Sequence, residues 1–164
     1  MLDKIERQTL KALAKQSIEY GLTHGSPLPI DIGTLSETLA APRATFVTIE
    51  KDGQLRGCIG MLEAQRPLAI DIAANSYAAA FADPRFLPVS ADELVYLDIY
   101  LSILSPAEPM HCESETELLQ LLRPNIDGLI LDDGVHRATF LPSVWESLPK
   151  PIDFIHHLKH KAGL

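Results

Sequence analysis

An Asp-Gly pair at residues 52–53 constrains the fold of this chain more than any other local feature. It lies between "ATFVTIE" and "LRGCIGML", two segments rich in β-branched and apolar residues. Asp-Gly favours the two-residue turns whose backbone twist matches that of two antiparallel strands. The sequence therefore predicts a β-hairpin over residues 44–62.

A second Asp-Gly pair lies in "GLILDDGVHRATF" and predicts a second hairpin. Helical segments follow both hairpins, and "FLPVSADEL" and "FLPSVWESL" share the tripeptide Phe-Leu-Pro. This similarity between the two halves indicates two internal repeats, although chance agreement of one tripeptide explains it equally well. No linker long enough to separate two domains is visible, so we expect residues 1–164 to form one domain.

The rest of the chain alternates between short helical and strand patterns. Apolar spacing predicts an N-terminal helix over residues 2–20 that ends at Gly21. The clearest strand is "YLDIYLSIL", in which every second residue is apolar. Further helices are expected at residues 67–82, after the capping patterns that begin at Thr34, Ser90 and Ser114, and at residues 143–148 and 152–162. The predicted class is α+β, with helices packed on one curved, mixed sheet.

Composition narrows the possible partners and compartments. The net charge of −8 disfavours non-specific binding to nucleic acids and to anionic membranes. The most apolar segment, "PLAIDIAANSYAAAF", is interrupted by polar residues and is too short to span a bilayer. Cys58 and Cys112 form neither a disulfide framework nor a four-ligand zinc site. With no secretory signal visible, we expect a cytoplasmic protein.

The stretch "LRGCIG", residues 55–60, is unusual for a strand because it contains an arginine, a thiol and two glycines. Strand alternation would place Arg56, Cys58 and Gly60 on one face, with the guanidinium close enough to favour a thiolate. Gly57 and Gly60 would leave the backbone open to a close neighbour. A reactive site is one interpretation. A buried, inert cysteine is the other, because spacing identifies no base for it.

Two further polar positions are candidates for the same site. In "DPRF", residues 83–86, Asp83 and Arg85 form either a simple turn or an anion clamp. Asn75 interrupts an alanine-rich helix and needs a partner, which is either a ligand or the protein itself. His156 and His160 are four residues apart, but a metal would need a third ligand. Positive charge at a helix C-terminus explains them better, so we expect no metal and no cofactor.

These motifs together resemble a known family. "LRGCIG", "AAFADPRFLPVSADELVYLDIYLSILSP", "GLILDDGVHRATFLPSVWESLP" and "HLKHKAGL" are similar to the AMMECR domain family, whose prokaryotic members are called AmmeMemoRadiSam system protein A. The resemblance spans nearly the whole chain. It implies an α+β fold with internal repeats around a single barrel-like sheet. Family members usually continue past "KAGL", so a terminal strand or tail is expected to be missing or absent.

The resemblance also implies a cleft built from the signature motifs. Carried over by motif, its residues are Arg56, Gly57, Cys58, Gly60, Asn75, Asp83, Arg85 and Phe86. The family's activity is unsettled, and its prokaryotic name implies association with a Memo-type protein and a radical S-adenosylmethionine protein.

Three functions fit these expectations. In the first, the cleft binds a small anionic ligand through Arg56 and Arg85, and the chain is an enzyme or enzyme subunit with Cys58 as nucleophile or ligand group. In the second, the glycine-rich surface is a non-enzymatic protein-interaction module. In the third, Cys58 is a redox sensor, but no resolving cysteine is visible because Cys112 lies in an unrelated loop.

Overall fold

A computed structural model describes all residues, 1–164. The chain divides into two compact units, Met1–Ala107 and Glu108–Leu164. The predicted α+β class is confirmed: helices alternate with antiparallel strands. The sheet differs in detail from the expectation, because the strands form one three-stranded and one two-stranded sheet. The second hairpin has strands of only four residues that pair with each other alone, and neither sheet closes into a barrel or contains a parallel pair.

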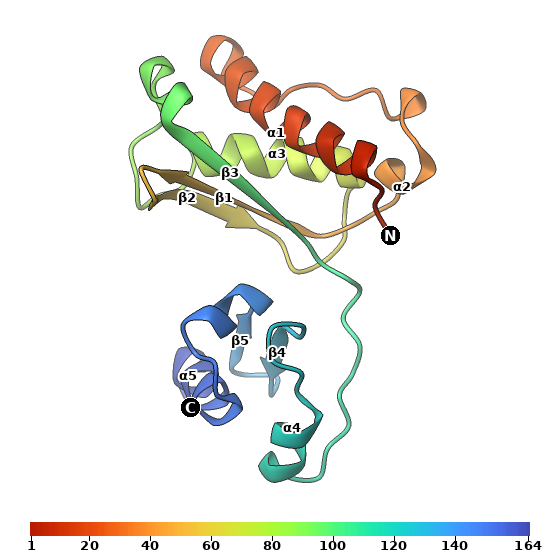
Figure 1. Ribbon diagram of the computed structural model, residues 1–164, viewed down its shortest axis with the longest axis vertical. Coiled ribbons are helices and arrows are strands. Elements are labelled where there is room, and N and C mark those ends of the chain that lie inside the picture. Colours follow the sequence, from red (N-terminus) through yellow and green to blue (C-terminus); the bar gives the residue numbers. More distant parts are fainter. The chain divides into compact units, whose positions relative to one another are not determined.

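The first unit contains one open sheet with helices on one side of it (Figure 1). β1 is the central strand, and β2 and β3 are the two edges. In chain order the elements are α1 (Lys4–His24), the 3₁₀-helix η1 (Ile32–Thr34), α2 (Glu37–Ala40), β1 (Thr45–Lys51), β2 (Gln54–Gly60), α3 (Leu68–Phe81), the 3₁₀-helix η2 (Ala91–Tyr96) and β3 (Leu97–Ile103). The first predicted hairpin is thus confirmed, and both turn residues, Asp52 and Gly53, have positive φ angles as the Asp-Gly turn requires.

Alternate residues of β1 build the core of this unit. Thr45, Val47 and Ile49 are fully buried, on the side where α1 and α3 lie (Figure 1). The predicted alternation of "YLDIYLSIL" is also confirmed, since Leu97, Ile99, Leu101 and Ile103 pack against the same core. The opposite face of the sheet carries Phe46, Thr48 and Glu50 of β1 beside Ser102, Tyr100 and Asp98 of β3.

Two predicted helix ends were wrong for physical reasons. α1 continues past Gly21 and ends at Gly25, which adopts the left-handed conformation with φ 67°. Gly21 has a different role, because a Cβ there would lie 2.6 Å from the Phe81 ring of α3. Ser36, not Thr34, caps α2, since its side chain accepts a hydrogen bond from Leu39 N.

The second unit is built around one aromatic cluster. Trp145 is buried and stacks on Phe154 with ring centroids 3.8 Å apart, and its Nε1 donates to the Asp127 carbonyl at 2.7 Å. The predicted helix at 143–148 is a 3₁₀-helix. The elements are α4 (Glu115–Leu121), β4 (Leu129–Asp132), β5 (Arg137–Phe140), the 3₁₀-helix η3 (Pro142–Glu146) and α5 (Pro151–Ala162).

The internal repeat stays a prediction. Both Phe-Leu-Pro segments lead into a 3₁₀-helix, η2 or η3. As for membranes, none of the helices combines the length and the apolar character that crossing a bilayer requires.

Candidate functional site

The "LRGCIG" strand contains a β-bulge. Ile49 of β1 pairs with Gly57, but the next residue, Glu50, pairs with Leu55. Arg56 is thus an extra residue of β2 that has no partner on β1. The regular alternation of side chains between the two faces of the sheet is interrupted at this position. Its side chain turns toward η2, so the expectation that the guanidinium lies beside the Cys58 thiol on a common strand face is corrected.

Arg56 forms a bidentate ion pair with Glu93 of η2. Nε donates to Oε1 at 3.0 Å and Nη2 to Oε2 at 3.1 Å. Lys51 also donates to Glu93 Oε1, at 3.1 Å. The Arg56 hydrogen bonds, followed by the backbone N–H of Ser90, hold the pKa of the Glu93 carboxyl well below its usual range. Glu93 therefore fixes two cations of the hairpin in place.

The "DPRF" loop caps the exposed edge of β2 at Cys58. Asp83 Oδ2 accepts from the Cys58 N–H at 3.0 Å, and Arg85 Nη2 donates to the Cys58 carbonyl at 3.5 Å. The two side chains thus occupy the positions that a neighbouring strand would otherwise fill. They also pair with each other, since Arg85 Nη2 donates to Asp83 Oδ2 at 2.8 Å. This pairing holds the pKa of the buried Asp83 carboxyl well below its usual range.

Phe86 brings the two arginines together. The guanidinium carbons of Arg56 and Arg85 lie 6.0 and 5.4 Å from the centroid of its ring, within the range of cation–π attraction. The structure thus joins the two motifs that the sequence singled out. We call Lys51, Arg56, Asp83, Arg85, Phe86 and Glu93 the edge cluster.

The Cys58 thiol lies beside this cluster but has no base. Cys58 is half-buried, and the hydrogen-bond partner of its Sγ is the Thr48 hydroxyl at 3.3 Å. No histidine or carboxylate side chain bonds to the sulfur. Nucleophilic catalysis usually needs such a group, and the only side chain bonded to the sulfur here is that of Thr48.

The two glycines of the motif have close protein neighbours. A Cβ on Gly57 would lie 2.0 Å from the Ala79 carbonyl oxygen of α3, and one on Gly60 would lie 2.3 Å from the Phe46 ring. Their small size is therefore required for packing within the unit. A role in binding a ligand stays a prediction.

Asn75 belongs to a second polar cluster, between α3 and β1. Its Nδ2 donates to Thr45 Oγ1 at 2.9 Å and to Asp71 Oδ2 at 3.0 Å. Arg66 donates to Asn75 Oδ1 at 3.3 Å and to Asp71 Oδ1 at 2.9 Å. We call Thr45, Arg66, Asp71 and Asn75 the inner cluster. Because protein groups occupy both ends of the Asn75 amide, its assignment to the ligand site gains no support.

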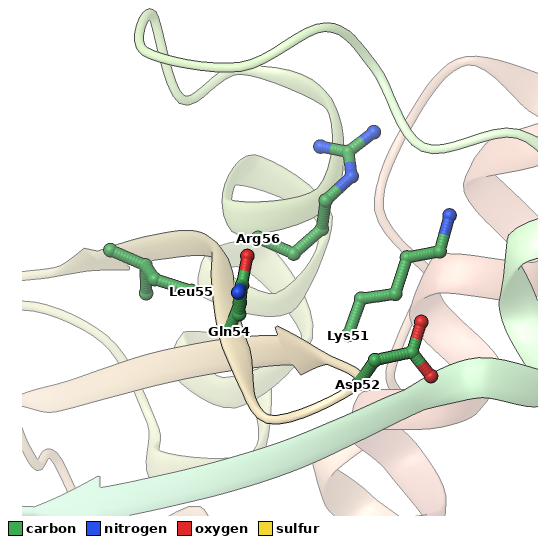
Figure 2. A pocket seen from close by; sticks show the side chains of 5 residues that line it. All are labelled: Lys51, Asp52, Gln54, Leu55 and Arg56. Carbon is green, nitrogen blue, oxygen red and sulfur yellow. The ribbon is translucent and has the colours of Figure 1, made fainter.

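A shallow hollow of about 400 Å³ opens at the hairpin end of the edge cluster. Figure 2 shows the Lys51 and Arg56 side chains rising from the hairpin in the same direction. Asp52, Gln54 and Leu55 complete its lining. Two cations thus face one concave surface.

Sequence reasoning missed Lys51 and Glu93 as members of this cluster. Glu93 was noticed only through its capping spacing with Ser90, and that capping box is present. Its contact with Arg56 joins residues 37 positions apart, for which the sequence carries no local signal. In the second unit, His156 lies 3.6 Å from Glu115, and no group of three or more potential metal ligands occurs in the chain.

The fold and these motifs define a class of protein. A family model described as AMMECR1 matches residues 11–164, and the chain belongs to the AMMECR1 family. This confirms the resemblance noted from the motifs.

Similar proteins occur in at least one archaeon and one bacterium. A protein of Methanothermobacter thermautotrophicus is 36% identical over 168 residues, covering 99% of this chain and 85% of the relative. One of Thermotoga maritima is 38% identical over 149 residues, covering 90% and 82%. Among solved structures, the chain is similar to the uncharacterized protein PH0010 of Pyrococcus horikoshii. The TM-score is 0.85 at 28% identity, covering 95% of this chain and 79% of that one.

Proposed function

We propose that the edge cluster binds a small anionic ligand. The observation that carries the proposal is the pair of guanidinium groups on Phe86. Arg56 and Arg85 are each fixed by a carboxylate through Nε and Nη2. Neither Nη1 group has a hydrogen-bond partner in the protein. Two preoriented donors beside one aromatic ring are suited to a carboxylate or phosphate group.

The local charge supports the same ligand class. Three cations, Lys51, Arg56 and Arg85, face two carboxylates, Asp83 and Glu93. The Asp52 carboxylate lines the adjoining hollow, so positive and negative groups balance here in a chain whose net charge is −8. A region of balanced charge repels an anion less than the rest of this acidic surface does.

The proposed role of the edge cluster is to bind a ligand, and catalysis at Cys58 would need a further group. A reaction that uses Cys58 as nucleophile, with Arg56 holding the substrate, needs a base from the ligand or from a partner, because no side chain of this protein supplies one. We therefore propose that the chain is a ligand-binding subunit that works with Memo-type and radical S-adenosylmethionine proteins, as the name of its prokaryotic family members implies. Free thiols at Cys58 and Cys112 fit the cytosol.

Titration with inorganic phosphate tests the binding proposal. We expect amide shifts in residues 56–60 and 83–86 by NMR, and at least a tenfold loss of affinity in Arg85→Gln, since a charge-assisted contact contributes about 1.5–3 kcal/mol. Arg123→Gln is the matched control. Arg123 is also held by a carboxylate, Asp127, but has no aromatic ring and no second arginine beside it. Equal losses in both variants would mean non-specific binding and would reject the proposal.

An interaction module is the second candidate. Four large apolar side chains within three positions of an edge-cluster member are exposed: Leu55, Leu87, Val95 and Tyr96. Exposed apolar side chains around a polar centre are typical of protein-binding surfaces. Val95→Ser with Leu87→Ser should abolish co-purification with the Memo-type protein while leaving phosphate binding intact. If co-purification never occurs, or survives both changes, this candidate fails.

A further inference from the structure

The two Asp-Gly turns of this chain use their carboxylates differently. In the second turn, Asp133 Oδ1 accepts hydrogen bonds from the N–H groups of Val135 and His136, and Oδ2 contacts His136 Nδ1 at 2.9 Å. In the first turn, the exposed Asp52 carboxylate has no hydrogen-bond or ion-pair partner in the protein. Both of its oxygens therefore stay available as acceptors.

The first turn does not require a negative charge at Asp52. Its positive φ angle of 53° is accepted by asparagine and glycine at least as readily as by aspartate. An uncharged residue would thus form the same hairpin. Turn geometry accounts for a short polar side chain at this position but not for its charge.

Asp52 shares a hollow of about 400 Å³ with Lys51 and Arg56, and Figure 2 shows the three side chains at the same end of the hairpin. Lys51 Nζ and Arg56 Nε both donate to Glu93 Oε1, at 3.1 and 3.0 Å, so the two cations lie close together. Lys51 donates only to Glu93, and Arg56 Nη1 donates to no group of the protein. Both cations therefore keep N–H donors for a ligand.

A purely anionic ligand does not explain Asp52. Its carboxylate would repel an anion bound at Lys51 and Arg56, whereas it would attract a positive group on the same ligand. The side chain of Leu55 is 43% exposed and also lines the hollow, where it is suited to the few carbon atoms that join two charged groups. The hollow thus offers cations, an anion and an apolar wall within one small volume.

We propose that the ligand of this site is a small zwitterion, in which an anionic group and a primary ammonium group are a few bonds apart. The anionic group binds Lys51 and Arg56, and the ammonium group donates to Asp52. This inference rests on the proposed anion-binding function and specifies its ligand class. Amino acids and aminoalkyl phosphates share this chemistry.

Two pairs of matched ligands test the ammonium group. O-phosphoethanolamine is compared with ethyl phosphate, and β-alanine with propionate, because the members of each pair differ chiefly in the amine. NMR titration of the full chain should show binding that is about threefold tighter or more for the member with the amine, the strength typical of an exposed ion pair. A preference in the first pair alone identifies an aminoalkyl phosphate, and one in the second pair alone identifies an amino acid. A preference in both pairs shows that either acid group is accepted.

Asp52→Asn tests the role of the carboxylate. Asn-Gly is a favoured turn sequence, so this variant keeps the hairpin, and the preference for the amine should fall below about twofold. Asp133→Asn removes the same charge from the second Asp-Gly turn and is the matched control, in which the preference should persist.

Three results would overturn the inference: no preference in either pair, a preference that survives Asp52→Asn, or an equal loss of preference in Asp133→Asn. Binding of ethyl phosphate that still depends on Arg85 would then leave the anion site intact. Absence of binding by inorganic phosphate, ethyl phosphate and propionate would reject the proposed function as well.

Discussion

The inner cluster and the edge cluster use the same chemistry in different surroundings. In each cluster, an arginine forms an ion pair with a carboxylate that is almost fully buried. The pairs are Arg66 with Asp71 and Arg85 with Asp83. In the inner cluster Thr45 and Asn75 complete the partners of Asp71. In the edge cluster the Arg85 side chain is 55% exposed, whereas that of Arg66 in the inner cluster is 35% exposed. The comparison therefore sets a cluster that holds the fold beside one that we propose binds a ligand.

The largest expected effect is at the centre of the inner cluster. Asp71→Asn removes the charge that Arg66 pairs with and replaces an acceptor of the Thr45 hydroxyl with an amide. Breaking a buried pair on one side costs about 3–5 kcal/mol, so we expect a loss of about 3 kcal/mol in the free energy of unfolding by urea. Asp92→Asn, at an exposed carboxylate, is the control and should change it by less than about 0.5 kcal/mol. A loss below 1 kcal/mol at Asp71 would remove the distinction between the clusters.

Asp83→Asn should reduce the free energy of unfolding less than Asp71→Asn does. It should also expose the Cys58 amide at the β2 edge to solvent. The Cys58 N–H and Arg85 lose a charged acceptor, which corresponds to about 1–2 kcal/mol. Hydrogen exchange at the Cys58 amide should become at least tenfold faster. Unchanged exchange would show that the "DPRF" loop does not protect the strand.

Acid should weaken the edge cluster in a defined pH window. Asp83 and Glu93 have pKa values held below their ordinary values of 3.8 and 4.5, so the unfolded chain takes up protons first as the pH falls. Their contribution to stability is complete above about pH 5 and is lost progressively below about pH 4.5. In urea titrations at pH 2–6, the double variant Asp83→Asn, Glu93→Gln should show a shallower decline. If the free energy of unfolding falls equally steeply with pH in both proteins, Asp83 and Glu93 do not cause the acid sensitivity.

The smallest effect is expected at the thiol. Serine in place of Cys58 keeps a partner for the Thr48 hydroxyl, and the site is only half-buried. We expect the free energy of unfolding to change by about 0.5 kcal/mol and phosphate affinity to stay within about twofold, or about 0.4 kcal/mol. A tenfold loss of affinity would place the sulfur in direct contact with the ligand.

Local features of the fold could be predicted from the sequence. Asp52 and Gly53 indicated the first turn because few other residue pairs accept two positive φ angles. The alternation in Leu97–Ile103 indicated a half-buried strand. Both depend on residues a few positions apart, and both predictions were confirmed.

Features that depend on distant partners could not be predicted. Nothing near Arg56 indicates a bulge, because the extra residue is defined only against β1. Asn75 was a candidate for the ligand site through the family resemblance, and its place in the sequence cannot show that Thr45 and Arg66 bond to its amide. For the same reason Gly57 was expected to face a ligand, although Ala79 lies against it.

The contact between Gly57 and Ala79 has a mechanical consequence. Here β2 and α3 meet backbone to backbone, with no side chain between them that could change rotamer and absorb a displacement. Any displacement of β2 at Gly57 would therefore be transmitted directly to α3. α3 carries Asp71 in its first turn and Asn75 at its middle, and it leads into the "DPRF" loop at its end. A fluorescent or NMR probe at Tyr77, on the same helix, would register events at the edge cluster without touching it.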